Sequence, residues 1–498
     1  MSAPMPLSTL LAGYAEAIPA VTVSGLQLDS RRIARGELFL ACRGSGNTHG
    51  LQHLAQAQAR GAVALAWEPA PQVEAPQTSL PQVAVPALAR RAGEIAARFY
   101  GQPGEALFCT GITGTDGKTS TAYLLAQALE TLGQPCGYIG TIGLGRVGAL
   151  DTATHTTPDP VQLQARLAAF RDEGLQACAM EVSSHALDQS RVAGLRFDTA
   201  VLSNITRDHL DYHGTVERYA AAKRRLFEQE GLRCAVLNRD DEHGACWLQQ
   251  LAPHLQTTAY GIEGAPPPGH YVLARDLALS VQGIAFTLDT HEGNARVHSG
   301  LLGRFNVYNL AAVAAVLLGR GEKIARIAQA LSAVHTVPGR MEGFRGAAQQ
   351  PLVIVDYAHT PEALQQILRA ARAHTTGKLS CVFGCGGDRD RGKRPLMGAA
   401  AQALADRVIV TDDNPRSEAP QAIVADILAG MNAAQTRVVH ERSAAIAEAI
   451  AAAGADDVVV IAGKGHEDYQ IIGSERRSFS DRAEVARLLG LPLAEHKP

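Results

Sequence analysis

The stretch from Leu107 to Thr121 constrains the fold more strongly than any other part of the chain; it reads Leu-Phe-Cys-Thr-Gly-Ile-Thr-Gly-Thr-Asp-Gly-Lys-Thr-Ser-Thr. This pattern predicts a short buried strand, a glycine-rich turn and a helix that begins at Ser120. Glycines let backbone N–H groups point inward, and the helix adds its positive N-terminal end. These are the parts of a phosphate-binding loop, although five residues separate Gly111 from Gly117 where the usual P-loop has four. The alternative interpretation is a generic glycine-rich turn.

Two side chains at the end of this loop suit ATP. Lys118 is placed to reach β- and γ-phosphate oxygens, and the Thr119 hydroxyl to ligate the Mg²⁺ that accompanies ATP. We expect Lys118 to be largely exposed. Only seven of the 46 basic residues are lysines, and Lys118, Lys223, Lys393 and Lys464 lie in or beside the motifs discussed here. Because arginine cannot release its proton near neutral pH, a site that needs a titratable amine must use lysine.

Length and composition describe an ordinary globular protein. At 498 residues the chain is too long for one hydrophobic core, and about three domains are expected. The net charge of −3 argues against a nucleic-acid partner, because such proteins usually carry a basic excess. No lysine or arginine precedes Arg31 and no apolar run is long enough to cross a bilayer, so we predict no signal peptide, no membrane span and a cytoplasmic location. The eight cysteines suit reduced core thiols better than a disulfide framework.

The chain divides into three segments of mixed strand and helix pattern. Residues 1–103 predict a small α/β domain that ends in a Gly/Pro-rich linker. Residues 104–337 alternate strands and helices, as a mostly parallel sheet covered on both faces requires. A second α/β series occupies residues 338–498. The predicted fold class is therefore α/β with three domains.

In the second segment, two further strands end in polar side chains. The strand at 175–181 delivers Glu181 at its C-terminal end, where P-loop proteins place a second Mg²⁺-orienting acid. The strand at 199–202 leads into a loop that contains His209. Because the carboxyl ends of parallel strands share one sheet edge, both side chains should lie beside the P-loop. For His209, metal ligation and a structural role are equally good interpretations.

Two predicted helices of this segment carry residues for which the sequence allows more than one role. Lys223 lies on a helix predicted from Val216 to Gln229, where the alternative is a solvated helix face, supported by the two arginines that follow. Asn306 and Asn309 enter an Ala/Val-rich helix. Their amides could hold a base or a ribose, or they could cap the helix.

Three strands of the third segment end in polar loops. These strands begin at Cys381, Val408 and Val458, and the loops after them contain glycines, carboxylates and basic side chains. Three such loops on one sheet edge predict a polar ligand pocket. The glycines after Phe383 match a dinucleotide-binding fingerprint only poorly.

Together these motifs resemble the Mur ligases, ATP-dependent amide-forming enzymes of peptidoglycan precursor synthesis. The resemblance covers essentially the whole chain, and the motifs occur in family order: Thr113-Gly-Thr-Asp-Gly-Lys-Thr119, Glu181-Val-Ser-Ser-His185, Asn306 with Asn309, Arg340, and Asp356-Tyr-Ala-His-Thr-Pro361. It implies a small N-terminal UDP-binding domain, a central P-loop ATPase domain with a mostly parallel sheet, and a C-terminal Rossmann-like domain that binds the amino acid. We expect a monomer.

Within the family, Asp413-Asn-Pro-Arg416 with Glu418 and Pro420 resembles the signature of members that add meso-2,6-diaminopimelate to UDP-N-acetylmuramoyl-L-alanyl-D-glutamate. Such members use ATP to make an acyl phosphate, from which the incoming amine displaces phosphate. Lysine-adding relatives lack this arginine pattern. The nearest alternatives are a lysine-adding ligase and a folylpolyglutamate synthase, and those of a different class are a P-loop phosphotransferase and a nucleotide-binding module without enzymatic activity.

The resemblance implies roles around the P-loop. The catalytic residues would be Lys118, Lys223, Glu181 and His209. Mg²⁺ would be held by Thr119, Glu181, His209 and Lys223, the last as a carbamate, which turns a cation into an oxygen ligand. The residues implied to bind ATP are Gly114, Thr115, Asp116, Gly117, Lys118, Thr119, Ser120, Asn306, Asn309, Arg340 and Asp356.

The resemblance also implies two substrate sites. The nucleotide sugar would contact Leu28, Ser30, Thr156, Thr157, Ser183, Gln189 and Arg191. Diaminopimelate would contact Arg389, Asp413, Asn414, Pro415, Arg416, Gly463 and Glu467, with the arginines facing its second carboxylate and Glu467 facing the ammonium. The sequence departs from the family in three places: Asp116 stands where asparagine is commoner, Ser45-Gly-Asn47 replaces a His-Gln-containing uridine loop, and His155 stands where some relatives carry asparagine.

Overall fold

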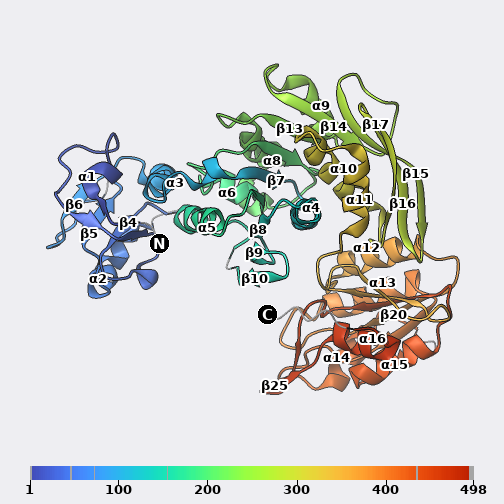
Figure 1. Cartoon of the computed structure of the whole chain (residues 1–498). Coiled ribbons are helices and arrows are strands. Elements are labelled where there is room, and N and C mark those ends of the chain that lie inside the picture. The colour runs from blue at the N-terminus through green and yellow to red at the C-terminus, as the bar shows by residue number, and fades with distance from the viewer. Residues whose placement is uncertain (1–2, 45–47, 72, 154, 433–435, 493–498) are drawn as a thin grey trace.

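The computed structural model describes residues 3–44, 48–71, 73–153, 155–432 and 436–492. Three α/β domains, each built on its own main sheet, follow one another along the chain (Figure 1). The predicted α/β class with three domains is therefore confirmed, while the boundaries at residues 103 and 337 stay predictions. The loop at Ser45–Asn47, singled out above, lies outside the described residues.

The N-terminal domain has a four-stranded parallel sheet in the order β3-β4-β5-β6. Leu26, Leu38, Leu40 and Ile95 are fully or almost fully buried between this sheet and its helices. The elements are β1 (Met5–Pro6), α1 (Leu7–Leu10), β2 (Thr22–Val23), β3 (Gly25–Gln27), β4 (Glu37–Ala41), α2 (Leu54–Ala59), β5 (Ala64–Trp67), β6 (Gln82–Ala84) and α3 (Leu88–Phe99).

The central domain has an eleven-stranded sheet in the order β10-β9-β8-β11-β7-β12-β13-β14-β15-β16-β17. Strands β8 to β15 of this order pair in parallel, and antiparallel strands close both edges, as the predicted mostly parallel sheet requires. Its first half comprises β7 (Phe108–Thr113), α4 (Lys118–Thr131), β8 (Cys136–Gly140), β9 (Gly143–Arg146), β10 (Ala149–Asp151), α5 (Pro160–Asp172), β11 (Ala177–Glu181), α6 (Ser184–Asp188), β12 (Thr199–Leu202), α7 (Leu210–His213) and α8 (Val216–Arg224).

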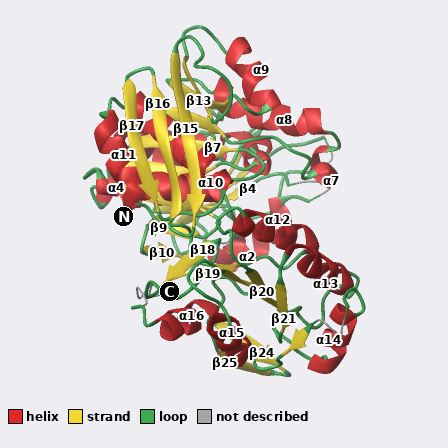
Figure 2. Ribbon diagram, turned by 90° about the vertical axis from the view of Figure 1, so that its right-hand side faces the viewer, coloured by secondary structure: helices red, strands yellow, loops and turns green. Residues whose placement is uncertain are grey.

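The second half of the central domain carries a long antiparallel meander and two helices that pack on it. It comprises β13 (Cys234–Asn238), α9 (Glu242–Gln250), β14 (Gln256–Gly261), β15 (His270–Ser280), β16 (Gly283–Thr290), β17 (Gly293–Ser299), α10 (Arg304–Gly319) and α11 (Ile324–Ala333). Strands β15, β16 and β17 run side by side toward the C-terminal domain (Figure 2). Helix α10 is apolar on all sides because it is buried between this sheet and α4.

The C-terminal domain has a six-stranded sheet in the order β18-β19-β23-β20-β21-β22, in which only β18 is antiparallel. Fully buried Val, Ile and Phe side chains on its inner strands explain the continuous apolar runs of the sequence. The elements are β18 (Glu342–Arg345), β19 (Leu352–Asp356), α12 (Pro361–Arg372), β20 (Leu379–Phe383), α13 (Lys393–Leu404), β21 (Arg407–Val410), α14 (Pro420–Leu428), β22 (Arg437–Val438), α15 (Arg442–Ala451), β23 (Val458–Ala462), β24 (Tyr469–Ile472), β25 (Glu475–Ser478) and α16 (Asp481–Leu489).

A buried ion pair ties the C-terminal helices to the sheet. The Arg442 and Asp481 side chains are fully buried, with Nε to Oδ1 at 2.7 Å and Nη2 to Oδ2 at 2.8 Å. Arg442 also donates to the Ala462 carbonyl at the end of β23 at 3.0 Å. The pair therefore holds the ends of α15, α16 and β23 together, next to the polar loops of this domain.

Replacing Asp481 with alanine is expected to lower the free energy of unfolding by about 3–5 kcal/mol, because it leaves the Arg442 charge buried without a partner. The matched control is Glu448→Ala, which breaks the exposed Arg437–Glu448 pair and should cost less than about 1 kcal/mol. Urea unfolding of both variants measures the difference. Equal losses in the two variants would contradict the assigned role of the buried pair.

Candidate active site

The three strands predicted to lead into the site lie next to one another. Strand β7 lies between β11 and β12, with Glu181 in register with Ile112 and Leu202 in register with Thr113. The loops after these strands therefore open at the same sheet edge, as predicted. The P-loop is in the middle of the three.

The P-loop has the backbone that its glycines suggest. Gly114 and Gly117 both have positive φ, 148° and 83°. A Cβ on Gly117 would lie 2.8 Å from Asn309 Oδ1, so glycine is required there for space as well as for conformation. The loop after β12 braces the P-loop, because the Thr115 N–H donates to the Asn204 carbonyl at 2.8 Å. Helix α4 begins at Lys118, two residues before the predicted start.

Lys118 folds back onto its own loop. Its amine donates to the carbonyls of Gly114 at 2.8 Å and Thr115 at 2.6 Å. The expectation that Lys118 is largely exposed is therefore wrong: the side chain is half-buried, and burial lowers the pKa of its amine. In this arrangement two carbonyls of the loop itself accept hydrogen bonds from the Lys118 amine.

Glu181 is buried and is held by several donors. Tyr138 and the Thr141 backbone N–H donate to Oε1, each at 2.7 Å, and the Thr119 hydroxyl donates to Oε2 at 2.8 Å. Only 1% of Glu181 is exposed. These hydrogen bonds fix the two Glu181 carboxyl oxygens next to Thr119.

Lys223 points inward from α8 to the back of the P-loop. Its amine donates to the Gly114 carbonyl at 2.6 Å and lies 4.4 Å from the centre of the Tyr219 ring. Burial, with the positive charge of Lys118 nearby, lowers the pKa of Lys223 to about 6. The alternative of a solvated helix face is wrong, because only 1% of Lys223 is exposed. The predicted helix also ends early, at Arg224, and continues as a 3₁₀ turn over Arg225–Glu228.

His209 lies at the same edge but makes different contacts. Its ring packs edge-to-face on His185 with centroids 4.8 Å apart, and its Nε2 is 3.4 Å from Asp208 Oδ2. About half of the side chain is exposed. Within the described ranges, no group of three or more His, Cys, Asp and Glu side chains could hold a metal ion.

Asn306 and Asn309 form a buried amide pair. Asn309 donates to Asn306 Oδ1 at 2.9 Å and accepts from the Thr121 hydroxyl at 3.1 Å, while Asn306 donates to the Leu302 carbonyl at 2.8 Å. Both lie inside α10, whose N-cap is Gly303, so the capping alternative is wrong. The pair connects α10 to the P-loop helix from behind.

The residues predicted for the nucleotide sugar fall into two groups. In the central domain, Thr157 donates to the Glu181 carbonyl at 2.8 Å, and Arg191 donates to the Thr157 carbonyl at 3.1 Å and to Gln189 Oε1. Thr156 bonds Thr141 at 3.0 Å, and Ser183 caps α6. In the N-terminal domain, Leu28 is half-buried and Ser30 donates to Gln56 Oε1 at 2.7 Å. The central group is thus joined to Glu181 directly through Thr157 and indirectly through Thr141.

Arg340 and Asp356 lie where the chain enters the C-terminal domain. Asp356 Oδ2 accepts from the Met341 N–H and Oδ1 from the Ala358 N–H, both at 2.7 Å. Burial raises the pKa of Asp356, although these bonds oppose the shift. The Arg340 side chain is exposed, and its positive charge also acts to lower the pKa of Asp356, against the effect of burial.

The predicted amino-acid residues meet at one end of the C-terminal sheet. Asn414 donates to Glu467 Oε2 at 3.1 Å and accepts from Lys464, which is 3.0 Å from the same Glu467 oxygen. Glu467 Oε1 is 3.5 Å from the Tyr469 hydroxyl. Asp413 is half-buried and approaches Gly463 (φ 120°), which has no room for a Cβ.

Arg416 comes from the same loop and faces the glycines after β20. Its Nη1 donates to the Gly387 carbonyl at 2.8 Å, and the residue has φ 53°, held by a backbone bond to Ile471 at 3.1 Å. Pro415 is buried, whereas Arg389 is exposed. The structure thus joins Asn414 to Glu467 and links the Arg416 backbone to Asn414 through Ile471, while the Arg416 side chain faces Gly387 and Arg389 lies on the surface.

Sequence reasoning missed three residues of these sites. Tyr219 is fully buried and bonds the Thr115 hydroxyl at 3.1 Å. Lys464 is fully buried against Glu467. Arg394 is fully buried and binds Glu418 at 2.8 Å and Asp426 at 2.9 Å, which positions the loop that carries Arg416. The spacing Tyr219-x-x-x-Lys223, one helical turn, was a usable signal for the first of them.

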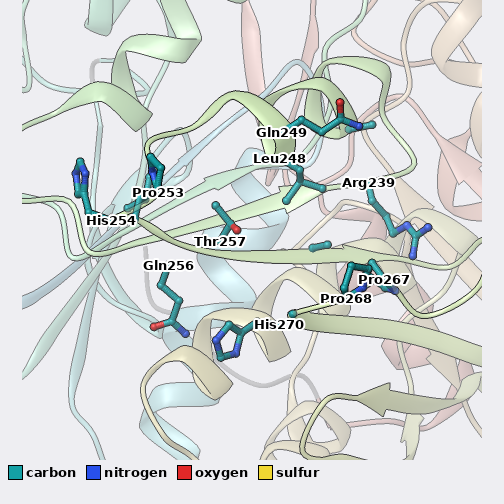
Figure 3. Close-up of a pocket in the computed structure, with 14 residues that line it drawn as sticks. Arg239, Leu248, Gln249, Pro253, His254, Gln256, Thr257, Pro267, Pro268 and His270 are labelled. Carbon is teal, nitrogen blue, oxygen red and sulfur yellow. The ribbon is translucent and has the colours of Figure 1, made fainter.

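A hollow of about 760 Å³ lies away from both sites, between α9, β14 and the loop before β15. Figure 3 shows Leu248, Thr257 and His270 along its walls. None of the predicted site residues lines it. Among the described helices, none is long and apolar enough to cross a membrane.

The fold and the site define a three-domain α/β protein whose P-loop meets a buried lysine and a buried glutamate. Three consecutive parts of the chain match parts of one family: residues 22–100 the "Mur ligase family, catalytic domain", residues 112–317 the "Mur ligase middle domain", and residues 339–465 the "Mur ligase, glutamate ligase domain". The chain belongs to the Mur ligase family, as the motifs predicted.

Full-length relatives are similar over the whole chain. Proteins of Ectopseudomonas mendocina (49% identical, covering 99% of this chain and 100% of the relative) and Xanthomonas campestris (50%, covering 98% of each) are both named UDP-N-acetylmuramoyl-L-alanyl-D-glutamate--2,6-diaminopimelate ligase. A solved structure with the same name is 36% identical, with a TM-score of 0.79, and covers 98% of this chain and 99% of that one. MurF from Acinetobacter baumannii, at 19% identity and a TM-score of 0.61 over 93% of this chain and 96% of its own, shares the fold.

Proposed function

We propose that this protein is an ATP-dependent ligase that adds meso-2,6-diaminopimelate to UDP-N-acetylmuramoyl-L-alanyl-D-glutamate in peptidoglycan precursor synthesis. Full-length relatives of 48–50% identity that carry this name support the proposal. The structural observation that best supports it is the placement of the predicted amino-acid residues at one end of the C-terminal sheet: Asn414 contacts Glu467, and both Asn414 and Arg416 bond to the Ile471 backbone. A cation and a carboxylate placed there would suit a zwitterion.

In the proposed reaction the glutamyl carboxylate attacks the γ-phosphorus of ATP, giving an acyl phosphate and ADP. The amine of diaminopimelate then attacks the acyl carbon, phosphate leaves with the C–O bonding pair, and the ammonium loses a proton. Lys118 would turn from the Gly114 and Thr115 carbonyls to the β- and γ-phosphates. Both steps gather negative charge, so catalysis consists mainly of positioning and cationic stabilisation.

The oxygen donors at the P-loop suit Mg²⁺. The Thr119 hydroxyl and the buried Glu181 carboxylate are 2.8 Å apart, and both are the hard ligands this ion prefers. We assign Thr119, Glu181, His209 and a carbamate on Lys223 to its coordination. Bound there, Mg²⁺ would neutralise phosphate charge. Lys223 supports this assignment because its lowered pKa leaves a neutral amine, the form that adds CO₂.

The other predicted residues divide between the two substrates and the nucleotide. Thr156, Thr157, Ser183, Gln189 and Arg191 would hold the dipeptide end of the nucleotide sugar beside Glu181, and Leu28 and Ser30 its uridine end. Gly114 to Ser120 would cradle the phosphates of ATP, Asn306 and Asn309 would lie on its adenine side, and Arg340 and Asp356 would approach it from the C-terminal domain. Arg389, Asp413, Asn414, Pro415, Arg416, Gly463 and Glu467 would surround diaminopimelate. We further propose a cytoplasmic monomer.

The test is phosphate release from ATP with purified UDP-muramoyl dipeptide, with amino acids added one at a time. Release that depends on diaminopimelate is expected. Release with lysine instead would favour a lysine-adding ligase, and release with glutamate on a folate substrate a folylpolyglutamate synthase. Phosphate transfer that needs no amino acid would overturn the proposal in favour of a phosphotransferase.

Replacing Arg416 with alanine is expected to lower kcat/KM for diaminopimelate far more than for lysine. Lysine lacks the distal carboxylate that Arg416 would pair with, so it leaves the half-buried Arg416 without that charged partner. The missing ion pair should make kcat/KM of the wild type for lysine lower than for diaminopimelate by a factor on the order of a thousand. In Arg416→Ala the ratio of the two kcat/KM values should be smaller. The variant Arg416→Lys should keep only part of the preference for diaminopimelate, because an ammonium group cannot make a bidentate contact with a carboxylate.

The measurement is kcat/KM for both amino acids in the wild type and in Arg416→Ala. The matched control is Arg437→Ala, which removes an exposed arginine of the same domain. Equal losses with the two amino acids would show that Arg416 supports the loop rather than selecting the substrate.

A further inference from the structure

His374 joins two domains, beside the segment where the chain enters the C-terminal domain. It follows α12 in the C-terminal domain and is 2% exposed. Its Nε2 lies 2.7 Å from the Gly303 backbone nitrogen, and its Nδ1 lies 2.7 Å from the Ser280 carbonyl oxygen. Both partners belong to the central domain: Ser280 ends β15, and Gly303 is the N-cap of α10.

These two contacts fix the protonation state of the ring. The Gly303 N–H can only donate, so Nε2 must accept; the Ser280 carbonyl can only accept, so Nδ1 must carry the proton. Only the neutral imidazole satisfies both partners. Burial lowers the pKa of His374, the Ser280 bond opposes this, and Arg345 on β18 is the charged group that adds to the lowering.

The surroundings of His374 show that this is a packed junction. Val281, in the turn between β15 and β16, and Leu302, before α10, both pack into the hydrophobic core of the C-terminal domain. Arg345 donates to Gln282 Oε1 in the same turn at 2.5 Å. The end of the β15–β16 hairpin is thus inserted into the neighbouring domain, where Figure 1 shows the long strands reaching α12.

The junction is also continuous with the nucleotide site. The Leu302 carbonyl accepts from Asn306, Asn306 from Asn309, and Asn309 from Thr121 of the P-loop helix. His374 therefore holds the C-terminal domain against α10, a helix that is hydrogen-bonded to the P-loop helix through Asn309. Loss of this contact is expected to change the distance between the predicted amino-acid residues and the P-loop.

We propose that His374 is a positioning residue of the ligase reaction, which sets the place of the C-terminal domain relative to the P-loop through Gly303 and Ser280. It touches no reacting atom, and the inference rests on the proposed function for its effect on amide formation. A displacement of about 1 Å between reacting groups costs on the order of a hundredfold in rate. Acyl phosphate formation involves the C-terminal domain only through Arg340 and Asp356, where the chain enters that domain, and should depend on His374 less.

The test compares His374→Leu, which removes both hydrogen bonds, with His374→Gln, which keeps one donor and one acceptor. His298→Leu, on the exposed face of β17, is the matched control. For His374→Leu we expect kcat for amide formation to fall about tenfold or more, while exchange of label between ADP and ATP without amino acid changes less than about threefold. His374→Gln should recover part of kcat.

Val281→Asp breaks the same junction without altering the histidine and should reproduce the selective loss of amide formation. Small-angle X-ray scattering of the full chain should show a broader distribution of domain positions in both disrupting variants and not in His298→Leu. Equal loss of exchange and amide formation, or scattering identical to wild type, would overturn the inference. If the wild type releases no phosphate with any amino acid, the proposed function fails, and scattering alone decides the role of His374.

Discussion

Replacing Lys118 with alanine is expected to reduce turnover by about a thousandfold or more while leaving the fold intact. A cation aimed at developing phosphate charge in a preorganised site contributes on this scale. The fold should survive because the bonds of this amine are local: Gly114 still accepts from Lys223 at 2.6 Å, and Thr115 lies at a half-exposed turn. The loss would therefore fall on chemistry rather than stability.

The measurements are steady-state turnover and urea unfolding of Lys118→Ala, with Lys323→Ala as the control on an exposed lysine of the same domain. Arginine at position 118 should rescue little, because its planar group does not fit the two carbonyls that the ammonium now binds. A folded alanine variant with turnover within about tenfold of wild type would remove Lys118 from the phosphate site.

Much of the site was predictable because strand patterns and turn residues are local properties. The P-loop, Glu181 and the three C-terminal loops each follow an apolar strand, and parallel pairing brings strand ends to one edge whatever the strand order. The order β11-β7-β12 then decides that Glu181 and the loop after Leu202 flank the P-loop. That order depends on long-range pairing, which local sequence does not encode.

Burial of charged residues was the part that local patterns could not give. Lys223 and its two following arginines look alike in the sequence, yet only Lys223 turns toward Gly114. No local pattern indicated that Arg394 and Lys464 are fully buried against carboxylates. Each of these positions depends on a partner from another element. His374 extends the same point, since its partners belong to another domain.

Lys118 lies in the P-loop, and Lys223 contacts the loop from α8. The pKa of Lys223 is lowered so far that its charge near neutral pH changes. At pH 7.5 a lysine of ordinary pKa has only about one molecule in a thousand neutral, whereas a pKa of about 6 makes nearly every Lys223 amine neutral. A neutral amine adds CO₂, forming the N–C bond and releasing one proton to give the carbamate. The lowered pKa of Lys223 therefore supports the proposed carbamate, which an exposed lysine would rarely form.

Replacing Lys223 with methionine is expected to lower turnover by about a thousandfold or more, as the loss of other charge-stabilising groups in active sites does. The fold should not be weakened. Methionine fills a similar volume and needs no hydrogen bond. The Lys223 amine lowers the free energy of unfolding at any pH at which it is protonated in the unfolded chain but not in the folded chain. Because the folded pKa of about 6 lies below the unfolded value of 10.5, wild-type stability should rise with pH between these values by more than that of the variant.

The carbamate is tested in two ways: by changing the supply of CO₂ to the wild type, and by offering small carboxylates in place of the carbamate oxygens to a variant. Wild-type activity should fall in CO₂-free buffer and return with bicarbonate, more completely at pH 8 than at pH 6, because only the neutral amine reacts. Lys223→Ala should regain part of its activity with high formate or acetate, whose oxygens can stand where the carbamate oxygens would be. Activity that is insensitive to CO₂, together with electron density for a bare amine in a nucleotide-bound crystal grown with bicarbonate, would show that Lys223 acts as an unmodified amine. The hydrogen bond from Lys223 to Gly114 would then be its whole contribution to the P-loop.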